Sequence, residues 1–433
     1  MIKRLLNHPV SRNALLMYSV QLSTYFLPLL TLPYLSRVLS PQKYGLIAFS
    51  QSFMWYFVSL TEYGFNLTAT RRVAIDAHDP EKVSRIFCSV MLAKLLLTAI
   101  GFVVMAAVVL GTPRLRPDWD LFGIGFLGVI GNLLFPVWLF QGLQKMQHIA
   151  ARDFIAKLTA VAALFLFVHS DRDYLLAAGV QSGGQVFAGF VGLLTVPYVT
   201  SIRLRFPTWS EVVESLKNGW SVFLSMAAMT LSGSTNTFIM GFFAPLSEVA
   251  YFSNAQRVIV AMRMLVSPVA TALYPHMGQK AAYSKAEGVR FLRKYSFLIS
   301  APFLLLSLCV LVTAPMAVRI VFGPQYAPTA LPLQIMAFSP FLLALSHCYS
   351  TNFMLAFGYE KQWSRIIFGS VIGNFALLIP LLYLLRPSVG VAVTWIVLDV
   401  ITTLLYYMFY RRHSVQYLDG LATGIETSAT KTG

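Results

Sequence analysis

Charged side chains inside apolar stretches are the residues of this chain that could do chemistry. Lys94 lies in an apolar stretch over residues 86–110, and Arg257 and Arg263 lie in another over residues 248–274. A charge at the centre of a membrane-spanning helix costs about 2.5–3.5 kcal/mol on insertion scales. These cations could form a lining that pairs with phosphate or acidic sugar groups, for which the arginine fork is well shaped.

Helix geometry limits how the two arginines could act together. At about 100° per residue, Arg257 and Arg263 point about 120° apart, so they could border one broad cavity but not one narrow stripe. A structural alternative stays open for both of them. Either arginine could pair with a carboxylate, and Arg263 could extend its side chain toward the membrane surface.

Few carboxylates accompany these cations inside the apolar stretches. Glu62 falls late in the second stretch, Glu248 opens the eighth and Asp399 lies within the twelfth. Glu62 and Asp399 are candidates for binding H⁺ or Na⁺ and coupling an ion gradient to movement. A structural ion pair with one of the three cations is an equally good interpretation for each. His347 is expected to be a packed polar group rather than a proton relay.

The sequence holds no recognisable catalytic or metal-binding motif. There is no GxSxG, HExxH or Walker motif, and the three cysteines form no CxxC pair. The segment GIGFLG (Gly123–Gly128) fits a dinucleotide fingerprint only superficially, because it lies in an apolar stretch and is better explained by helix packing. We therefore expect neither an enzyme nor an ATP-driven pump, and no cofactor or metal.

The composition indicates which elements must position these residues. Of the 433 residues, 57% are hydrophobic and 12% are charged, against about 45–50% apolar and about 25% charged in soluble domains. So few charges could not keep a chain of this length dissolved. Stretches of about 20 apolar residues predict an all-α integral membrane protein with about twelve helices. They cover residues 13–35, 44–66, 86–110, 119–142, 154–170, 173–199, 218–243, 248–274, 295–318, 328–350, 364–385 and 388–410.

The basic residues indicate how such a protein would be oriented. The formal net charge of +16 would suggest a nucleic-acid partner in a soluble protein. Most Lys and Arg residues, however, fall at the chain ends and in the even-numbered connections between stretches. By the positive-inside rule this distribution places both termini in the cytoplasm and favours an even number of spans. We expect no nucleic-acid partner.

A weak internal repeat suggests how the helices are grouped. The segment SPQKYGLIAFS (residues 40–50) is similar to APLSEVAYFSNA (residues 244–255), and each segment lies at the turn between the first and second helix of its half. The repeat predicts two six-helix lobes, an arrangement found in secondary transporters, where substrate binds between the halves. The expected boundaries are 1–205 and 206–412, followed by a polar, disordered cytoplasmic tail over 413–433.

Four segments carry motifs in a recognisable order: TLPYLSRVLSPQKYGLIAFSQSF (Thr31–Phe53), TEYGFNLTATRRVA (Thr61–Ala74), EVAYFSNAQRVIVAMRMLVSPVATALYPHMG (Glu248–Gly278) and VFGPQYAPTALPLQIMAF (Val321–Phe338). With them the chain resembles, over roughly residues 10–410, the oligosaccharide lipid flippases of the polysaccharide-transport family (the Wzx or O-antigen type). The resemblance implies the multidrug/oligosaccharidyl-lipid/polysaccharide exporter (MOP) superfamily, with a MATE-like fold of two six-helix lobes around a central cavity. Ala250 departs from the family pattern, which commonly has glycine there.

The resemblance also implies a function. Such flippases move undecaprenyl-pyrophosphate-linked sugar units, which build lipopolysaccharide O-antigen or capsule, from the inner to the outer leaflet of the bacterial inner membrane by alternating access. Their partners would be this lipid-linked oligosaccharide, membrane lipids and other polysaccharide-assembly proteins. Arg257 falls within the eighth-helix signature, so it is the first candidate for holding the pyrophosphate, together with Arg263 or Lys94.

Two other functions remain alternatives at this point. A MATE-like exporter of drugs or other cations could use the same fold, but cationic cargo favours buried carboxylates and the clearest mid-span charges here are basic. A polysaccharide polymerase or ligase is a weaker alternative, because such enzymes usually present a large outward loop and the sequence has only short ones.

Overall fold

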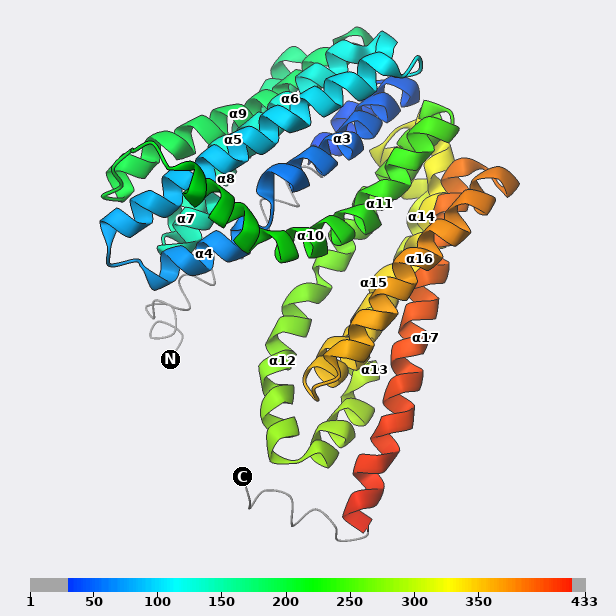
Figure 1. The fold of residues 1–433 in the computed structure, drawn as a ribbon. Helices are drawn as coiled ribbons and strands as arrows, with labels where there is room; N and C mark the ends of the chain where they lie inside the picture. Colours follow the sequence, from blue (N-terminus) through cyan, green and yellow to red (C-terminus); the bar gives the residue numbers. More distant parts are fainter. Residues whose placement is uncertain (1–29, 423–433) are drawn as a thin grey trace, which may run out of the picture. The chain divides into compact units, whose positions relative to one another are not determined.

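The computed structural model describes residues 30–422, and these form helices joined by short connections with no β-strand among them. They fall into two compact units, which divide between Ala250 and Tyr251: unit 1 precedes this boundary and unit 2 follows it. Each unit is described separately below, with the element labels of Figure 1. The predicted all-α class of membrane protein is confirmed. Most of the first predicted span, 13–35, lies outside the described residues.

Unit 1 is built from long helices that begin at strong sequence signals. Ser40 accepts a hydrogen bond from the backbone N–H of Lys43, and Asp79 accepts from those of Glu81 and Lys82. Each cap is followed by a proline in the first turn, which lacks only an N–H that would be unbonded anyway. The helices are α3 (Pro41–Glu62), α4 (Phe65–Ile75), α5 (Pro80–Gly111), α6 (Trp119–Leu134), α7 (Val137–Gly142), α8 (Met146–Phe167), α9 (Tyr174–Val199) and α10 (Trp209–Phe243).

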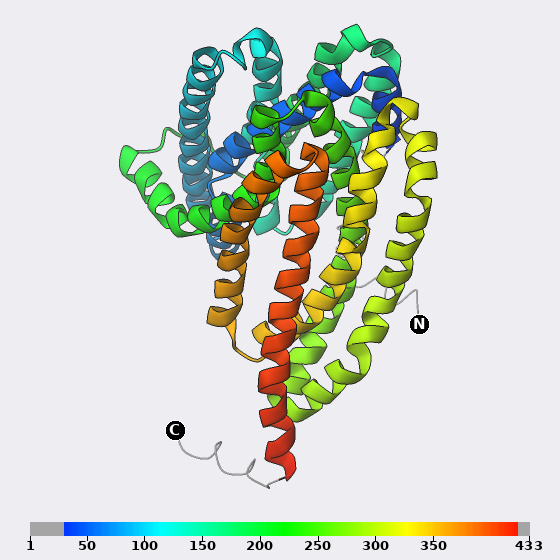
Figure 2. The same ribbon diagram turned by 90° about the vertical axis from the view of Figure 1, so that its right-hand side faces the viewer.

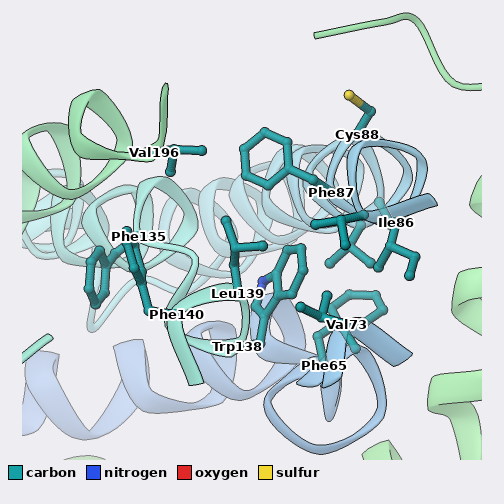
Figure 3. Packing of buried hydrophobic residues seen from close by; sticks show 14 of the residues in the cluster. Phe65, Val73, Ile86, Phe87, Cys88, Phe135, Trp138, Leu139, Phe140 and Val196 are labelled. Atoms are coloured by element: carbon teal, nitrogen blue, oxygen red, sulfur yellow. The ribbon is translucent and has the colours of Figure 1, made fainter. Parts of the chain in front are cut away.

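An aromatic core lies at one end of unit 1. The indole of Trp138, on the short helix α7, is fully buried and lies between α4 and α5, near Phe65 and Phe87 (Figure 3). Phe135 and Phe140 stack beside it, with ring centroids 5.6 Å apart. This packing fixes α7 to α4 and so fixes the interruption between α6 and α7 that precedes it.

Helix α10 packs within unit 1, although the sequence repeat assigns it to the second half of the chain. It contacts α3, α4 and α5. Just beyond it, an ideal Cβ at Gly45 would lie 1.8 Å from the backbone oxygen of Leu246, so only glycine permits this approach. A packing unit is defined by contacts and a sequence repeat by similar residues, so their boundaries need not coincide. The two lobes divided near residue 205 stay a prediction.

Unit 2 contains the remaining helices: α11 (Leu246–Met264), whose start belongs to unit 1, α12 (Val266–Tyr283), α13 (Lys285–Val321), α14 (Ala330–Ile335), α15 (Ser339–Tyr349), the π-helical segment η5 (Ser350–Leu355), α16 (Glu360–Leu384) and α17 (Pro387–Ala422). Figure 2 shows α16 (orange) and α17 (red) running side by side, and they are in direct contact. The hydroxyls of Tyr359 and Tyr417 lie 2.6 Å apart. The prediction of a disordered tail from residue 413 is wrong for residues 413–422, which belong to α17, and residues 423–433 lie outside the described residues.

Six described segments are long and apolar enough to cross a membrane: Pro80–Gly111, Arg116–Gly142, Lys285–Val321, Pro324–Leu355, Glu360–Leu384 and Pro387–Tyr417. The sequence predicts further spans over α3, α8, α9 and α10, and one over residues 248–274, which the structure divides between α11 and α12. Helix α8 holds a shorter apolar stretch, Lys157–Phe167. The protein is therefore a multi-pass helical membrane protein, and the count of twelve spans stays a prediction with which these helices agree.

Candidate functional site

The first cluster of charged and polar side chains lies in unit 1, where α3, α5 and α6 are in contact. Lys94 on α5 is only 2% exposed, and its Nζ donates a hydrogen bond to the backbone oxygen of Asn132 on α6 at 3.1 Å. Nδ2 of Asn132 donates to Oε1 of Glu62, the last residue of α3, also at 3.1 Å. Two residues selected from the sequence, Lys94 and Glu62, are thus connected through a third that was not.

Threonine hydroxyls extend this cluster along α3 and α5. Thr98, one turn after Lys94, donates to the backbone oxygen of Lys94 at 2.8 Å. Its Oγ1 lies 3.1 Å from Oγ1 of Thr61, which precedes Glu62. Both threonines are buried. Hydrogen bonds between buried side chains fix the relative register of helices more specifically than apolar contacts do, so α3 and α5 are held in register beside the charged groups.

Close packing of α6 against α9 determines where Asn132 lies. An ideal Cβ at Gly131 would lie 2.5 Å from the backbone carbon of Gln185, and one at Gly189 would lie 2.4 Å from the backbone oxygen of Gly131. Such distances are too short for any side chain, and small residues permit this approach of membrane helices. The packing role predicted for the GIGFLG segment is confirmed at Gly128, which lies against Gln185, whereas Gly123 faces open space.

The second cluster lies in unit 2 and contains a direct ion pair. Nη1 of Arg263 on α11 lies 2.8 Å from Oδ2 of Asp399 on α17, and the two side chains are 22% and 19% exposed. The hydroxyl of Ser339 accepts from Arg263 at 2.7 Å and donates to Asp399. Trp395 donates from Nε1 to the same hydroxyl at 3.2 Å, and its ring lies 5.5 Å from the guanidinium carbon of Arg263.

This second cluster joins three helices near Leu265, the single residue that separates α11 from α12. Helix α11 ends at Met264, directly after Arg263, and α12 begins at Val266. Ser339 opens α15, and Asp399 lies within α17. Of the two interpretations of Arg263 that the sequence left open, pairing with a carboxylate is the one that the structure shows. That Arg263 also contacts the pyrophosphate of a cargo stays a prediction.

The remaining charged or titratable candidates lie on α11 and α15. Arg257 is half-buried on α11, and Glu248 lies in the first turn of that helix. Because Lys94 belongs to unit 1 and both arginines to unit 2, a cavity shared by the three cations stays a prediction. His347 on α15 is hydrogen-bonded through Nδ1 to the hydroxyl of Thr351, at 3.1 Å.

The described residues contain no cluster of three or more His, Cys, Asp or Glu side chains that could hold a metal ion. Of the free cysteines, Cys88 and Cys348 are buried and Cys309 is exposed. The charged groups of the two clusters could bind an anion at a cation, or a proton or small cation at a carboxylate.

Comparison with known proteins shows the family to which the chain belongs. The sequence pattern of the family described as "Polysaccharide biosynthesis protein" matches residues 10–281, more than half of the chain. The chain belongs to this family. A relative from Escherichia coli K12, named "Putative O-antigen transporter", is 31% identical over 93% of this chain and 97% of its own length. A relative of the same name from Shigella dysenteriae is 29% identical over 86% and 93%.

Solved structures with the same fold come from the MOP superfamily. A lipid II flippase, MurJ, in an inward closed conformation gives a TM-score of 0.70 at 12% identity, covering 96% of this chain and 94% of that one. An inward-facing multidrug resistance MATE transporter gives 0.68 at 14% identity, covering 96% and 100%. At such identities the likeness concerns the fold of this polysaccharide biosynthesis protein, and it confirms the MATE-like fold that the resemblance implied.

Asn132, Ser339 and Trp395 contact the charged side chains of the clusters, and sequence reasoning missed all three. Asn132 gave a usable signal, since it is a polar residue in an apolar, glycine-rich stretch four residues before a proline. Ser339 and Trp395 gave none, because a serine and a tryptophan are ordinary residues in a membrane helix. Their roles follow only from the tertiary contacts with Arg263 and Asp399.

Proposed function

We propose that this protein is a transporter that flips undecaprenyl-pyrophosphate-linked oligosaccharide units, O-antigen or capsule repeats, across the bacterial inner membrane. The cargo moves from the inner to the outer leaflet by alternating access, and both termini of the protein lie in the cytoplasm. Family membership and the names of the two relatives support this function. The protein itself performs no covalent chemistry, and other polysaccharide-assembly proteins supply and use its cargo.

One observation carries the mechanism: each unit holds a mid-span cation beside a carboxylate that the sequence selected for ion coupling. Lys94 is connected to Glu62 through Asn132, and Arg263 is paired with Asp399. A pyrophosphate that binds a cation competes with its carboxylate. The carboxylate then favours H⁺ or Na⁺, because an unpaired charge in a membrane span is costly. Cargo binding and ion binding are thereby coupled.

In this mechanism the cations bind the phosphate groups of the cargo. Arg257, with Arg263 or Lys94, holds the pyrophosphate, because guanidinium groups bind phosphate oxygens in bidentate geometry. The polyprenyl tail stays in the surrounding lipid, where it retains its apolar environment. Glu62 and Asp399 bind the coupling ion. No other cofactor is required, since the driving force comes from the ion gradient.

The experiment that tests the cationic site is Arg257→Ala in the native host. We expect strong loss of surface polysaccharide at normal protein levels in the membrane, and partial activity for Arg257→Lys, which keeps the charge but not the fork. Arg365→Ala, on α16, is the matched control, because it removes an arginine to which no role is assigned. Wild-type amounts of surface polysaccharide in Arg257→Ala would contradict the assignment.

A MATE-like exporter is the second candidate, favoured by carboxylates within predicted spans. Asp399, however, is occupied by Arg263, which leaves it less suited to a cationic drug. Drug susceptibility of a deletion strain separates the two functions. Hypersensitivity to cationic drugs with intact surface polysaccharide supports the exporter, and the opposite pattern supports the flippase.

A further inference from the structure

The interruption between α6 and α7 leaves one backbone carbonyl in an unusual state. In an α-helix the carbonyl of a residue accepts from the N–H four residues later. Four residues after Asn132 stands Pro136, which has no N–H to donate. A proline also disfavours helical geometry in the residue before it, and Phe135 is indeed extended, with φ −99° and ψ 108°. The carbonyl of Asn132 is therefore open to another donor.

Lys94 supplies that donor. Its ammonium lies 3.1 Å from the open carbonyl oxygen at the carboxyl end of α6, where the helix dipole favours positive charge. The side chain is 2% exposed, so in this conformation the cation is held inside unit 1. A buried ammonium is expensive unless hydrogen-bonded, and the proline break provides a partner that an uninterrupted helix would have used internally.

The side chain of Asn132 faces the other candidate residue. Its Nδ2 donates to Oε1 of Glu62 at 3.1 Å, while its backbone oxygen accepts from Lys94. One residue thus contacts the cation through its main chain and the carboxylate through its side chain. A displacement of α6 at Asn132 must change both contacts together, because they belong to the same residue.

We propose that Asn132 is a positioning residue that, with Pro136 keeping its carbonyl open, sets where Lys94 stands relative to Glu62 and so tunes how the cation is presented to an anionic, pyrophosphate-bearing cargo. This inference rests on the proposed function. Asn132 acts on the cargo through Lys94 and need not touch it. Its backbone governs Lys94 and its side chain governs Glu62, so the two contacts can be removed separately.

Two substitutions separate the contacts. Pro136→Ala restores an N–H that competes for the carbonyl of Asn132, and Asn132→Ala removes the donor to Glu62 but keeps the carbonyl. Helix α16 offers matched controls, the within-helix proline Pro380 and the buried Asn374. Pro380→Ala and Asn374→Ala make the same chemical changes away from Lys94.

The first measurement is flipping in proteoliposomes, with undecaprenyl pyrophosphate carrying one fluorescently labelled sugar as the probe. We expect each test variant to raise KM about fivefold, which corresponds to about 1 kcal/mol for one hydrogen bond, with kcat changed less than about twofold. A variant that merely misfolds lowers the amount of active protein but leaves KM unchanged. We also expect an unchanged KM for the two control variants. Unchanged KM in both test variants overturns the proposal.

The second measurement does not depend on transport: a double-mutant cycle between Pro136→Ala and Lys94→Met on the Tm of the purified, detergent-solubilised protein. We expect Pro136→Ala to lower Tm more in the wild-type background than in the Lys94→Met background, because the contact is already lost in the latter. Additive effects overturn the Lys94–Asn132 contact. If the cycle shows coupling but the wild-type protein does not flip the probe, the Lys94–Asn132 contact stands and the proposed function is refuted instead.

Discussion

The cation–carboxylate clusters of the two units are built differently. In unit 2, Arg263 and Asp399 pair directly at 2.8 Å, and Ser339 contacts both. In unit 1, Asn132 stands between the two charges: its backbone oxygen accepts from Lys94, and its side-chain amide donates to Glu62. A direct pair inside a membrane is costly to separate, because each partner leaves an uncompensated charge. A bridged pair lets either partner change its charge state while Asn132 still bonds the other.

Both clusters nevertheless lie at helix interruptions. Lys94 bonds to the end of α6, which stops before Pro136, and Arg263 lies at the end of α11, two residues before Leu265, which separates α11 from α12 but keeps helical angles (φ −68°, ψ −19°). Unwound backbone in a span offers free polar groups to cargo and coupling ions in transporters, and of these two interruptions the one at Phe135 is extended. The difference therefore concerns strength: the unit 2 pair fastens α11 to α17, and the unit 1 pair is suited to adjustment.

The largest expected effect comes from breaking the direct pair. Asp399→Asn leaves Arg263 without a counter-charge and should lower the free energy of unfolding by about 3 kcal/mol, the lower end of the range for broken buried pairs, because both side chains are about one-fifth exposed. Glu62→Gln should cost only about 1 kcal/mol, since Asn132 can still donate to the glutamine oxygen. Denaturant titration of the purified protein in mixed micelles measures both.

A control shows whether charge is the cause of the loss at Asp399. The double substitution Arg263→Met with Asp399→Leu removes both charges and should recover most of the stability, as apolar replacements of buried pairs do. Equal losses for Asp399→Asn and Glu62→Gln would remove the distinction between a direct and a bridged pair.

A smaller effect is expected from moving α6, on which only the bridged pair depends. Gly131→Ala places a Cβ 2.5 Å from the backbone of Gln185, so α6 must shift, at a cost of about 1–3 kcal/mol typical of overpacking. Gly123→Ala in the same helix meets nothing within 4 Å and should be neutral or slightly stabilising. Thermal unfolding compares the two variants.

Transport gives this comparison a functional readout. Gly131→Ala should reduce surface polysaccharide because Asn132, the next residue, carries both contacts of the unit 1 cluster. Gly123→Ala should leave it unchanged. If Gly131→Ala is destabilised but flips cargo normally, the position of Asn132 does not govern transport, and the unit 1 cluster is only structural.

The residues of both clusters were predictable in part, and their connections were not. A charge in an apolar stretch stands out in the sequence, which is why Lys94, Glu62, Arg263 and Asp399 could be selected from residue type and place alone. Which of them meet depends on helix packing across long sequence separations. Arg263 and Asp399 are 136 positions apart, and no local pattern encodes that pairing.

The fold was predictable to a similar degree. Hydrophobicity and length predict membrane helices because every backbone polar group in a bilayer must be bonded internally, and the all-α class follows from that requirement. Helix interruptions are harder to predict. Pro136 lies inside the predicted span 119–142, and a proline in a membrane helix either bends or breaks it, depending on the neighbours that satisfy the freed groups. Here Lys94, far away in sequence, is that neighbour.

A solvent-exposed ion pair outside the predicted spans can be compared with the two clusters. Its expected contribution to stability is the smallest of the three. Arg205, just before α10, donates to Glu211 in its first turn, and Glu211 also accepts from the backbone N–H of Thr208 at 2.9 Å. The hydrogen bond from Arg205 is the main reason why the pKa of Glu211 is lowered from its ordinary 4.5. Exposed pairs contribute only about 0.2–1 kcal/mol, and salt weakens them.

The sign of the pH dependence follows from the lowered pKa. Because the folded protein holds the ionised form of Glu211, its contribution is fully present above pH 4.5 and is lost as pH falls through the lower folded pKa. Tm should therefore drop less between neutral and acid pH in Glu211→Gln than in the wild type. High salt should shrink this difference but leave the cost of Asp399→Asn nearly unchanged, since a membrane-embedded pair is poorly screened. Equal salt sensitivity of the two variants would place the Arg263–Asp399 pair in contact with bulk water, and the contrast between the clusters would then be one of exposure rather than of construction.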